Sequence, residues 1–412
     1  MRRINIKYHL LLGLLSSTCL IFVTTACRNI SKPLCSGDSK AVQRNQTTTT
    51  VFEAGKDGYK VYRIPAIIRC ANQDLLAFCE ARQGGDASEI DLVLKRSKDH
   101  GKTWGDLQVV QESDDFKSII QDQNTSITIG NPAPVVDMLD PANTGRIWLP
   151  FTLENDRVFV TYSDDNGHTW AERKEITKDV KLDSWGWYAT GPVHSIQIQK
   201  GLHRGRLVIP VDHRLGEDGK DRGALGAHVV FSDDHGQSWQ LGAVDNTYED
   251  GINANETTVV ELGGGVLYFN TRDHQGEAPG TRGESWSFDG GGSFKTRQSE
   301  WKTFQPASEI LDPPVVQCSL LRLSTGMIVF SGPDENGPSG PGRSDLRLRF
   351  SQDEANNWQD GRLIHIGPAA YSDMVQTDDG LLGVLFENGD ATGKNAYQRI
   401  SFARVPFGLI RE

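Results

Sequence analysis

The segment Ser97-Lys98-Asp99-His100-Gly101-Lys102-Thr103-Trp104 is the first copy of a short pattern that recurs along this chain. Aspartate caps the backbone N–H groups of a tight turn, and glycine readily adopts the positive φ that such a turn requires. We interpret the pattern as a structural turn whose aromatic side chain anchors it to its own sheet, and not as a catalytic or calcium-binding motif. The copies, which we call the aspartate turns, occupy residues 97–104, 163–170, 232–239, 287–294 and 351–358.

The spacing of the aspartate turns indicates the architecture. Successive copies begin 55 to 69 residues apart, which is enough for one four-stranded antiparallel blade and a loop. From residue 51 onward, short β-rich runs alternate with Gly, Asp and Asn turns, and a helical hydrophobic period is almost absent. Blades of this kind stack radially. Five marked blades and one unmarked blade that closes the ring predict an all-β fold, a six-bladed β-propeller over residues 51–412.

The N-terminal segment has the pattern of a secretory signal. Three basic residues within 1–7 precede a short apolar run over 10–23, which is too short for a comfortable membrane span. We expect a signal peptide over residues 1–26 and a polar tether over 27–50. The end of the signal resembles a bacterial lipoprotein cleavage site with Cys27 as the lipid-bearing residue, and simple cleavage is the alternative. The expected location is the bacterial cell envelope, in the periplasm or on the outer membrane, or secretion from the cell.

Composition excludes several classes of protein. The 412 residues carry a formal net charge of −11, about −14 without residues 1–26, so a nucleic-acid binder that relies on bulk charge is not expected. The cysteines remaining after signal removal are sparse and odd in number, which is not a disulfide framework, and they lack zinc-ligand spacing. We therefore expect no metal site and no cofactor.

Hairpin geometry gathers polar residues at one end of the predicted blades. The midpoint of the sequence between Arg63 and Arg82 falls within the turn signal at 71–74. We therefore expect these two residues to face each other at the open end of a hairpin. Asp86 lies just beyond, in a Gly-Gly loop at that same end. The next strand then runs back to the first aspartate turn. Asp86 and the aspartate turns are thus predicted to lie on opposite faces.

Two later hairpins also carry polar residues placed symmetrically about their turns. Glu256 and Arg272 are centred on a triple-glycine turn, and Tyr371 and Glu387 on an Asp-Asp-Gly turn. Arg343 lies in a Gly/Pro loop that is again far from the turn of its own hairpin. Arginines, carboxylates and one tyrosine therefore converge on the face opposite the aspartate turns, which predicts a site there.

The motif Tyr62-Arg63-Ile64-Pro65, followed by the aspartate turns, resembles the bacterial exo-sialidase (neuraminidase) family, whose repeats of this kind are called Asp boxes. The resemblance covers essentially all of residues 51–412. It implies a six-bladed propeller glycoside hydrolase in which Arg63, Arg272 and Arg343 bind the substrate carboxylate. A planar guanidinium suits this task because it binds a carboxylate through two charge-assisted hydrogen bonds.

The resemblance also implies the catalytic residues. Asp86 matches the acid/base, Tyr371 the nucleophile and Glu256 the base that activates it. A tyrosine nucleophile is a known exception among glycosidases. It suits an anionic sugar because a carboxylate nucleophile would be repelled by the substrate carboxylate, whereas a tyrosine hydroxyl starts neutral. Two displacements at the anomeric carbon predict retention of configuration.

Further contacts follow from the same resemblance. Arg82 matches the residue that contacts the 4-position of the sugar, Glu387 the carboxylate that orients Arg63, and Asn131 a further polar contact. Trp185 and Trp187 are candidates either for the wall of an N-acetyl pocket or for packing within a blade.

The expected function is hydrolysis of terminal sialic acid from glycoproteins, glycolipids and oligosaccharides, with a role in ganglioside and oligosaccharide catabolism. Intramolecular or intermolecular transfer of sialic acid is the alternative among enzymes, because the same catalytic set serves it. A non-catalytic sialic-acid-binding propeller would need the arginines but not Tyr371, Glu256 or Asp86. The expected partners are sialylated glycans, without nucleic acid, and with a membrane only through the lipid anchor. We expect a monomer.

Overall fold

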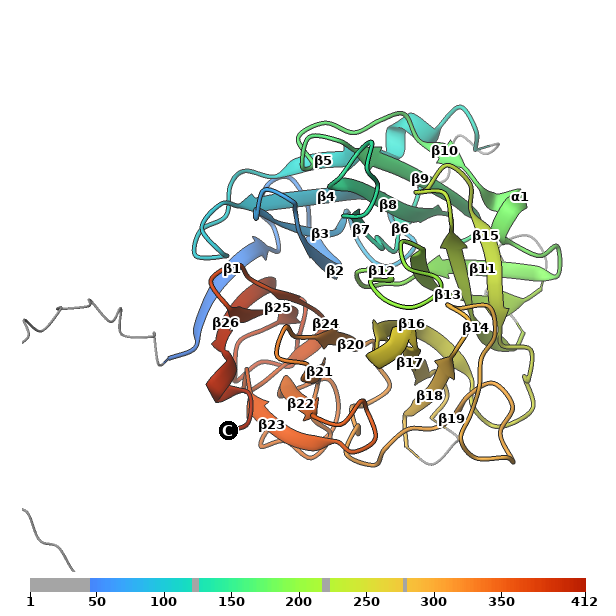
Figure 1. The fold of residues 1–412 in the computed structure, drawn as a ribbon. Coiled ribbons are helices and arrows are strands. Elements are labelled where there is room, and N and C mark those ends of the chain that lie inside the picture. Colours follow the sequence, from blue (N-terminus) through green and yellow to red (C-terminus); the bar gives the residue numbers. More distant parts are fainter. Residues whose placement is uncertain (1–44, 121–125, 217–222, 277–279) are drawn as a thin grey trace, which may run out of the picture. The chain divides into compact units, whose positions relative to one another are not determined.

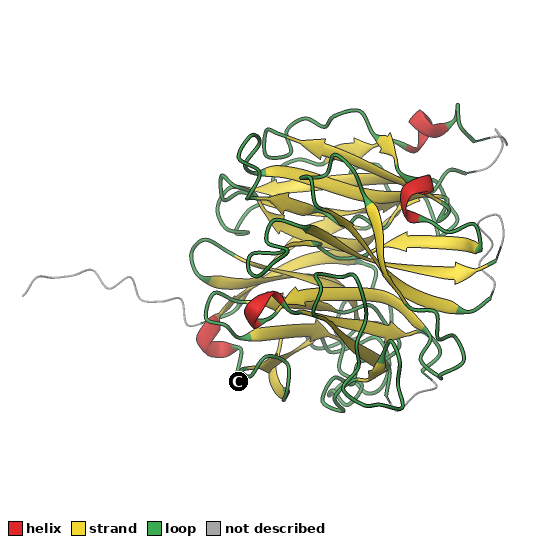
Figure 2. Cartoon of the chain, turned by 45° about the vertical axis from the view of Figure 1, so that its right-hand side comes forward, coloured by secondary structure: helices red, strands yellow, loops and turns green. Residues whose placement is uncertain are grey.

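The computed structural model describes residues 45–120, 126–216, 223–276 and 280–412. The regular secondary structure of this part of the chain is almost entirely β-strand, joined by loops and turns (Figure 2), with one four-residue helix, α1 (Thr177–Val180). Single turns of 3-10 helix occur at Ser113–Phe116, Gly263–Gly265 and Phe407–Leu409. None of the helices in these ranges has the length and apolar character needed to cross a membrane. The expected signal segment, Cys27 and most of the expected tether lie outside the described residues.

Across the described ranges, six antiparallel sheets follow one another around a common centre (Figure 1), which confirms the predicted six-bladed β-propeller. Blade 1 comprises β2 (Val61–Arg69), β3 (Leu75–Arg82), β4 (Ile90–Ser97) and β5 (Gln108–Gln111). Blade 2 comprises β6 (Ile129–Gly130), β7 (Val135–Asp137), β8 (Arg146–Leu153), β9 (Arg157–Ser163) and β10 (Lys174–Glu175). Blade 3 comprises β11 (Trp185–Thr190), β12 (Ile196–Gln197), β13 (Leu207–Leu215), β14 (Leu225–Ser232) and β15 (Gln240–Val244).

The remaining three blades complete the ring. Blade 4 comprises β16 (Ala254–Glu261), β17 (Leu267–Asp273), β18 (Arg282–Ser287) and β19 (Gln305–Pro306). Blade 5 comprises β20 (Ser319–Arg322), β21 (Ile328–Gly332), β22 (Arg347–Ser351) and β23 (Gln359–Leu363). Blade 6 comprises β24 (Ala369–Gln376), β25 (Leu381–Asn388), β26 (Arg399–Pro406) and β1 (Thr47–Glu53).

The ring closes by pairing the two ends of the described chain in blade 6. Strand β1 adds to β26 in an antiparallel ladder that begins with Thr47 opposite Arg404 (Figure 1). The expected boundary at residue 51 is therefore wrong by four residues. The threonines at 47–50 that we assigned to the tether form the first four of the seven residues of β1, because threonine is β-branched and the edge of β26 is available for pairing. Blade 6 is also the blade without an aspartate turn, as predicted.

The aspartate turns have the predicted internal chemistry. In the first turn, Asp99 Oδ1 accepts a hydrogen bond from the backbone N of Thr103 at 2.9 Å, and Ser97 Oγ accepts one from the N of Gly101 at 2.8 Å. Gly101 has φ +82°. Ala355, which replaces this glycine in the fifth turn, has φ +60°, and its N still donates to Ser351 Oγ at 3.1 Å. The turn thus survives the substitution.

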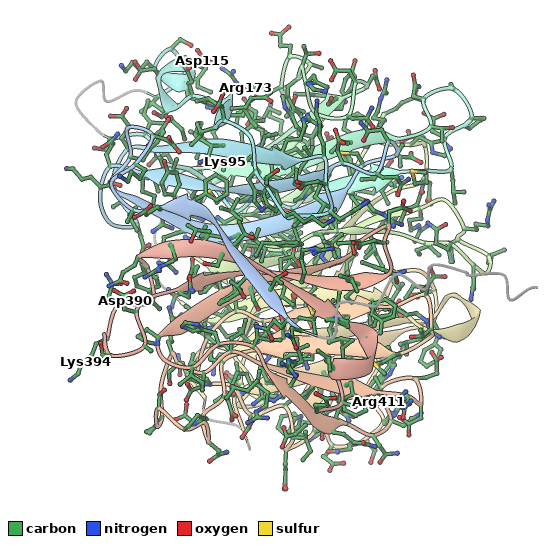
Figure 3. The ribbon with its side chains drawn as sticks, turned by 90° about the vertical axis from the view of Figure 1, so that its left-hand side faces the viewer. Lys95, Asp115, Arg173, Asp390, Lys394 and Arg411 are labelled. Atoms are coloured by element: carbon green, nitrogen blue, oxygen red, sulfur yellow. The ribbon has the colours of Figure 1, made fainter. Side chains whose placement is uncertain are left out.

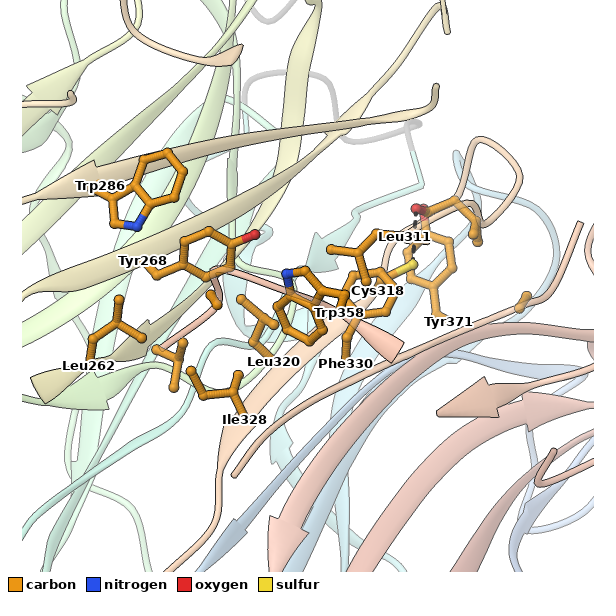
Figure 4. Close-up of a cluster of buried hydrophobic side chains, with 14 of the residues drawn as sticks. Leu262, Tyr268, Trp286, Leu311, Cys318, Leu320, Ile328, Phe330, Trp358 and Tyr371 are labelled. Carbon is orange, nitrogen blue, oxygen red and sulfur yellow. Dashed lines mark hydrogen bonds between the residues drawn. The ribbon is translucent and has the colours of Figure 1, made fainter. Parts of the chain in front are cut away.

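The aromatic residues of the turns mostly hold neighbouring blades together, and here our expectation is wrong. Trp104 of blade 1 packs edge-on against Phe402 of blade 6, with ring centroids 5.4 Å apart. Trp170 likewise contacts Phe78 of blade 1 at 5.9 Å. In blade 5, Trp358 lies between Tyr268 of blade 4 and Phe330 of its own blade (Figure 4). Phe294 of the fourth turn is the exception, because it packs against Phe269 and Phe304 of its own blade.

Strand register places the two faces of the propeller. Leu75 pairs with Ser97, and Arg82 pairs with Ile90, so the first aspartate turn and Asp86 lie at opposite ends of blade 1, as predicted. The apolar clusters lie within and between the blades, and one of them reaches Tyr371 (Figure 4). Charged side chains such as Lys95, Asp115 and Asp390 lie along the outside (Figure 3).

Candidate active site

A cavity of about 480 Å³ receives side chains from all six blades. Eight of the nine propeller residues that we predicted for the site line this cavity, and the ninth, Glu387, is fully buried. Those at the cavity surface are Arg63, Arg82, Asp86, Asn131, Glu256, Arg272, Arg343 and Tyr371. Residues from five predicted hairpins and loops therefore meet at one place, on the face opposite the aspartate turns.

Tyr371 and Glu256 form the central contact of this cavity. The hydroxyl of Tyr371 donates a hydrogen bond to Glu256 Oε1. Arg272 Nη1 donates to Glu256 Oε2 at 2.7 Å and also approaches Tyr371 Oη at 3.4 Å. One carboxylate thus bridges a phenol and a guanidinium, which together occupy both of its oxygens.

Charge states follow from this arrangement. Burial would raise the pKa of Glu256, but the positive charge of Arg272 and the hydrogen bond from Tyr371 lower it below its ordinary value. Burial and the charge of Glu256 both raise the pKa of Tyr371, against the opposing effect of Arg272 and two further arginines. Near neutral pH the pair is therefore an ionised carboxylate that accepts a hydrogen bond from a neutral phenol.

Glu387 supports both Arg63 and Tyr371 from beneath the cavity. Its Oε1 accepts hydrogen bonds from Arg63 Nε at 2.7 Å and from the N of Ile64 at 2.9 Å. Its Oε2 accepts from the N of Tyr371 at 3.1 Å. The expected contact between Glu387 and Arg63 is present, and it joins blade 6 to blade 1.

The register of the first hairpin differs from the expected one. Arg63 lies opposite Glu80, and Arg82 lies opposite Val61, so the two arginines are not partners. Two offsets of one residue each cause this difference. The ladder next to the turn pairs Arg69 with Leu75, one residue away from the expected register, and a β-bulge between Arg63 and Ala66, where Ile64 adopts φ +60°, shifts the register by one residue more. Arg63 and Arg82 still reach the same end of the blade, which is why both line the cavity.

Arg82 is held by carboxylates on both sides. Its Nε and Nη2 donate to Glu80 Oε2 at 2.8 and 2.5 Å, and its Nη1 donates to Asp86 Oδ1. The Asp86 side chain is 87% exposed. Partial burial would raise its pKa, but the charge and hydrogen bond of Arg82 lower it below the ordinary value. Asp86 is therefore ionised near neutral pH.

Sequence reasoning missed the role of Glu80. Its side chain is almost fully buried, and Oε1 accepts a hydrogen bond from the N of Asn131 at 2.8 Å. Glu80 therefore couples Arg82 of blade 1 to Asn131 of blade 2. The available signal was a second charged residue, two positions before Arg82, in a strand whose other residues are apolar.

Trp185 and Trp187, which we expected either to pack within a blade or to line a pocket, lie in different surroundings. Trp185 is buried and stacks on His213 with ring centroids 3.9 Å apart, so it packs within blade 3. Trp187 lines the cavity. Further lining residues that the sequence did not single out include Asn155, Arg214, Asn255, His274 and Tyr397.

Comparison with known proteins agrees with this geometry. The family model described as BNR repeat-like domain matches residues 73–384. An exo-alpha-sialidase of Aspergillus fumigatus is 29% identical over 395 residues, which cover 86% of this chain and 86% of that protein. The chain belongs to the sialidase family of β-propeller glycoside hydrolases.

Other members of the sialidase family are similar over the same region. A sialidase of Micromonospora viridifaciens is 30% identical over 81% of this chain, which spans about half, 51%, of that longer protein. The solved structure of the Hadza microbial sialidase Hz136 superposes with a TM-score of 0.72 at 26% identity, covering 88% of this chain and 69% of the other. The sialidase resemblance drawn from the sequence is therefore confirmed.

Proposed function

We propose that this protein is an exo-α-sialidase that hydrolyses terminal sialic acid from glycoproteins, glycolipids and oligosaccharides with retention of configuration. The observation that carries the proposal is the convergence of Arg63, Arg272 and Arg343 around the hydrogen-bonded pair Tyr371 and Glu256. Three guanidinium groups match a sugar that carries a carboxylate on its anomeric carbon. The named relatives support the same activity.

In the proposed first step, Tyr371 Oη attacks the anomeric carbon as Glu256 takes its proton. The bond to the leaving oxygen breaks, and Asp86 protonates that oxygen. In the second step Asp86 takes a proton from water, the water oxygen attacks the anomeric carbon, and the bond to Tyr371 breaks. Glu256 then returns the proton to the phenolate. The lowered pKa of Asp86 disfavours its protonated form near neutral pH, so we expect turnover to be favoured at acidic pH.

Incubation with sialyllactose and identification of the product test the proposal. Release of free sialic acid, first as the α anomer, is expected. Release of an anhydro sugar, or transfer to an added sugar acceptor, would instead establish the transferase alternative. Binding without any product would establish a sugar-binding propeller.

We propose further that the protein is a monomeric lipoprotein of the bacterial cell envelope, with Cys27 as the lipid-bearing residue. The support is the basic, apolar and small-residue order of residues 1–27. In a bacterial expression host, the full chain should partition into detergent, and Cys27→Ala should move it to the aqueous phase. Equal partition of both proteins would contradict the anchor, and light scattering of the soluble form measures its oligomeric state.

A further inference from the structure

We propose that Tyr397 is a fourth residue of the carboxylate-binding group, which positions Arg63 and Arg343 and donates its own hydroxyl to the substrate carboxylate. The inference rests on the proposed function, because it concerns how the same site binds its anionic substrate. Tyr397 lies in the loop between β25 and β26 and lines the cavity.

The three arginines differ in the side chains that hold them in place. Arg63 is paired with Glu387, and Arg272 with Glu256, each at 2.7 Å. Among the described residues, no carboxylate forms an ion pair with Arg343. Its Nη1 donates to Tyr397 Oη at 3.0 Å, and its Nη2 donates to the carbonyl of Val315 at 3.2 Å. Tyr397 is thus the only side chain in these ranges that orients Arg343 by a hydrogen bond.

Tyr397 also contacts Arg63. The guanidinium of Arg63 lies 4.0 Å from the centroid of the Tyr397 ring and 5.1 Å from that of Tyr371. Stacking on an aromatic face fixes the plane of a guanidinium, and that plane decides which carboxylate orientation it can bind through two hydrogen bonds. One side chain therefore positions two of the three arginines.

The Tyr397 hydroxyl can donate a hydrogen bond to a ligand. Its oxygen accepts the hydrogen bond from Arg343, and no described residue accepts a hydrogen bond from it. A phenol that accepts from a cation becomes a stronger donor, since the two hydrogen bonds polarise each other. Because Tyr397 lines the cavity beside two guanidinium groups, an anionic oxygen held there is its natural acceptor.

The loop that carries Tyr397 is held by contacts within the fold. Asn395 Oδ1 accepts a hydrogen bond from the N of Tyr397 at 2.8 Å, and the adjacent Ala396 is buried in the apolar cluster that includes Tyr371. At the base of the loop, Asp390 pairs with Arg399 of β26. These contacts within the fold position Tyr397 at the cavity.

The test compares Tyr397→Phe, which keeps the stacking ring, with Tyr397→Leu, which removes both ring and hydroxyl. Calorimetry measures binding of the 2,3-unsaturated derivative of sialic acid and of its methyl ester, and kinetics with sialyllactose give kcat and KM. Tyr59→Phe is the matched control. The Tyr59 hydroxyl donates a hydrogen bond of 2.7 Å to Asp91 Oδ2, and neither residue lines the cavity.

We expect Tyr397→Phe to weaken binding of the free acid about 10-fold, and Tyr397→Leu about 100-fold, with much smaller losses for the ester. KM should rise with kcat nearly unchanged, because the carboxylate is bound in both ground and transition states. Tyr59→Phe should match the wild type. Unchanged binding of the acid, or equal losses for acid and ester, would overturn the inference. A wild type that binds the acid but releases no product refutes the proposed hydrolysis and leaves this binding test intact.

Discussion

The fully buried carboxylate of Glu387 accepts a hydrogen bond from Arg63 Nε at 2.7 Å while holding the backbone of Tyr371 with its other oxygen. Burial alone would lower the pKa of Arg63, but the charge of Glu387 outweighs this effect and raises it. Removing the negative charge leaves a buried guanidinium without its counter-ion. We expect Glu387→Gln to destabilise the protein by about 3 kcal/mol and to raise KM for a sialoside.

The matched control for Glu387→Gln is Glu175→Gln, which breaks an Arg–Glu pair on the surface with Arg157. Exposed pairs contribute about 0.5 kcal/mol or less, so this variant should unfold close to the wild type in urea. Equal losses in the two variants would show that burial of Glu387 does not determine its contribution.

Replacement of Tyr371 by Phe tests the proposed nucleophile. The ring and its packing remain, but the oxygen that would attack the anomeric carbon is lost, and Glu256 loses one hydrogen-bond donor. We expect kcat to fall at least about 1000-fold while binding of the unsaturated sialic acid derivative persists. Full turnover by Tyr371→Phe would refute the mechanism.

Asp86→Asn tests the acid/base role. With sialyllactose, whose leaving group requires a proton, kcat/KM should fall about 100-fold or more. An aryl sialoside with an acidic phenol as leaving group should be much less affected in its first step. Glu89→Gln, an exposed carboxylate of the same loop, is the control and should retain activity with both substrates. The same loss with both substrates would argue against proton donation by Asp86.

The features that the sequence predicted are those set by local chemistry. An aspartate, a glycine and a hydroxyl residue at fixed spacing favour a tight turn, so counting the turns predicted five blades, and the remaining unmarked segment predicted the sixth. Hairpin ends followed from turn positions, and they placed Arg63, Glu256 and Tyr371 on one face.

The features that the sequence did not predict depend on contacts between distant segments. The bulge at Ile64 places a β-branched residue at φ +60°, which no local pattern indicates, and it shifts the partner of Arg63 to Glu80. The turn aromatics reach adjacent blades, a relation visible only once the ring is closed. Tyr397 lies in a loop without a motif, and its proximity to Arg343 depends on the assembled blades 5 and 6.

The aspartate turns predict how stability depends on pH. Partial burial would raise the pKa of Asp165, but hydrogen bonds from Thr169 and Ser163 lower it to about 2. The pKa is also lowered by hydrogen bonds, against desolvation, in the other four turns, at Asp99, Asp234, Asp289 and Asp353. An unfolded aspartate has a pKa of about 3.9. The stabilisation is therefore present above about pH 4 and is lost as the pH falls toward 2.

Melting temperatures between pH 2 and 7 check this expectation. Asp165→Asn should melt below the wild type at pH 7, and the gap should close as the pH falls through this window. The exposed Asp183 lies outside the turns, and Asp183→Asn should follow the wild type throughout. A gap for Asp165→Asn that stays constant down to pH 2 would show that its charge is not the stabilising element.

Gly101 separates the two possible reasons for a glycine in an aspartate turn. At φ +82° an alanine is strained, and its Cβ would also lie 2.0 Å from Cε1 of the buried Phe402. Gly55 has nearly the same φ, +80°, and a methyl group added there would have nothing within 4 Å, so Gly55→Ala measures the backbone cost alone, about 1 kcal/mol. Gly101→Ala should cost about 3 kcal/mol in urea unfolding, because overpacking is added.

The additional loss of stability expected for Gly101→Ala arises at the contact with Phe402, which lies between two blades. Phe402 belongs to blade 6 and Trp104 to blade 1, so a methyl group at residue 101 would push apart the first and last blades, where β1 closes the ring. Ala355 shows that the turn backbone itself accepts alanine. Equal losses in Gly101→Ala and Gly55→Ala would mean that φ alone requires glycine. A larger loss at Gly101 would show that these turns need glycine chiefly because the adjacent blade lies against them.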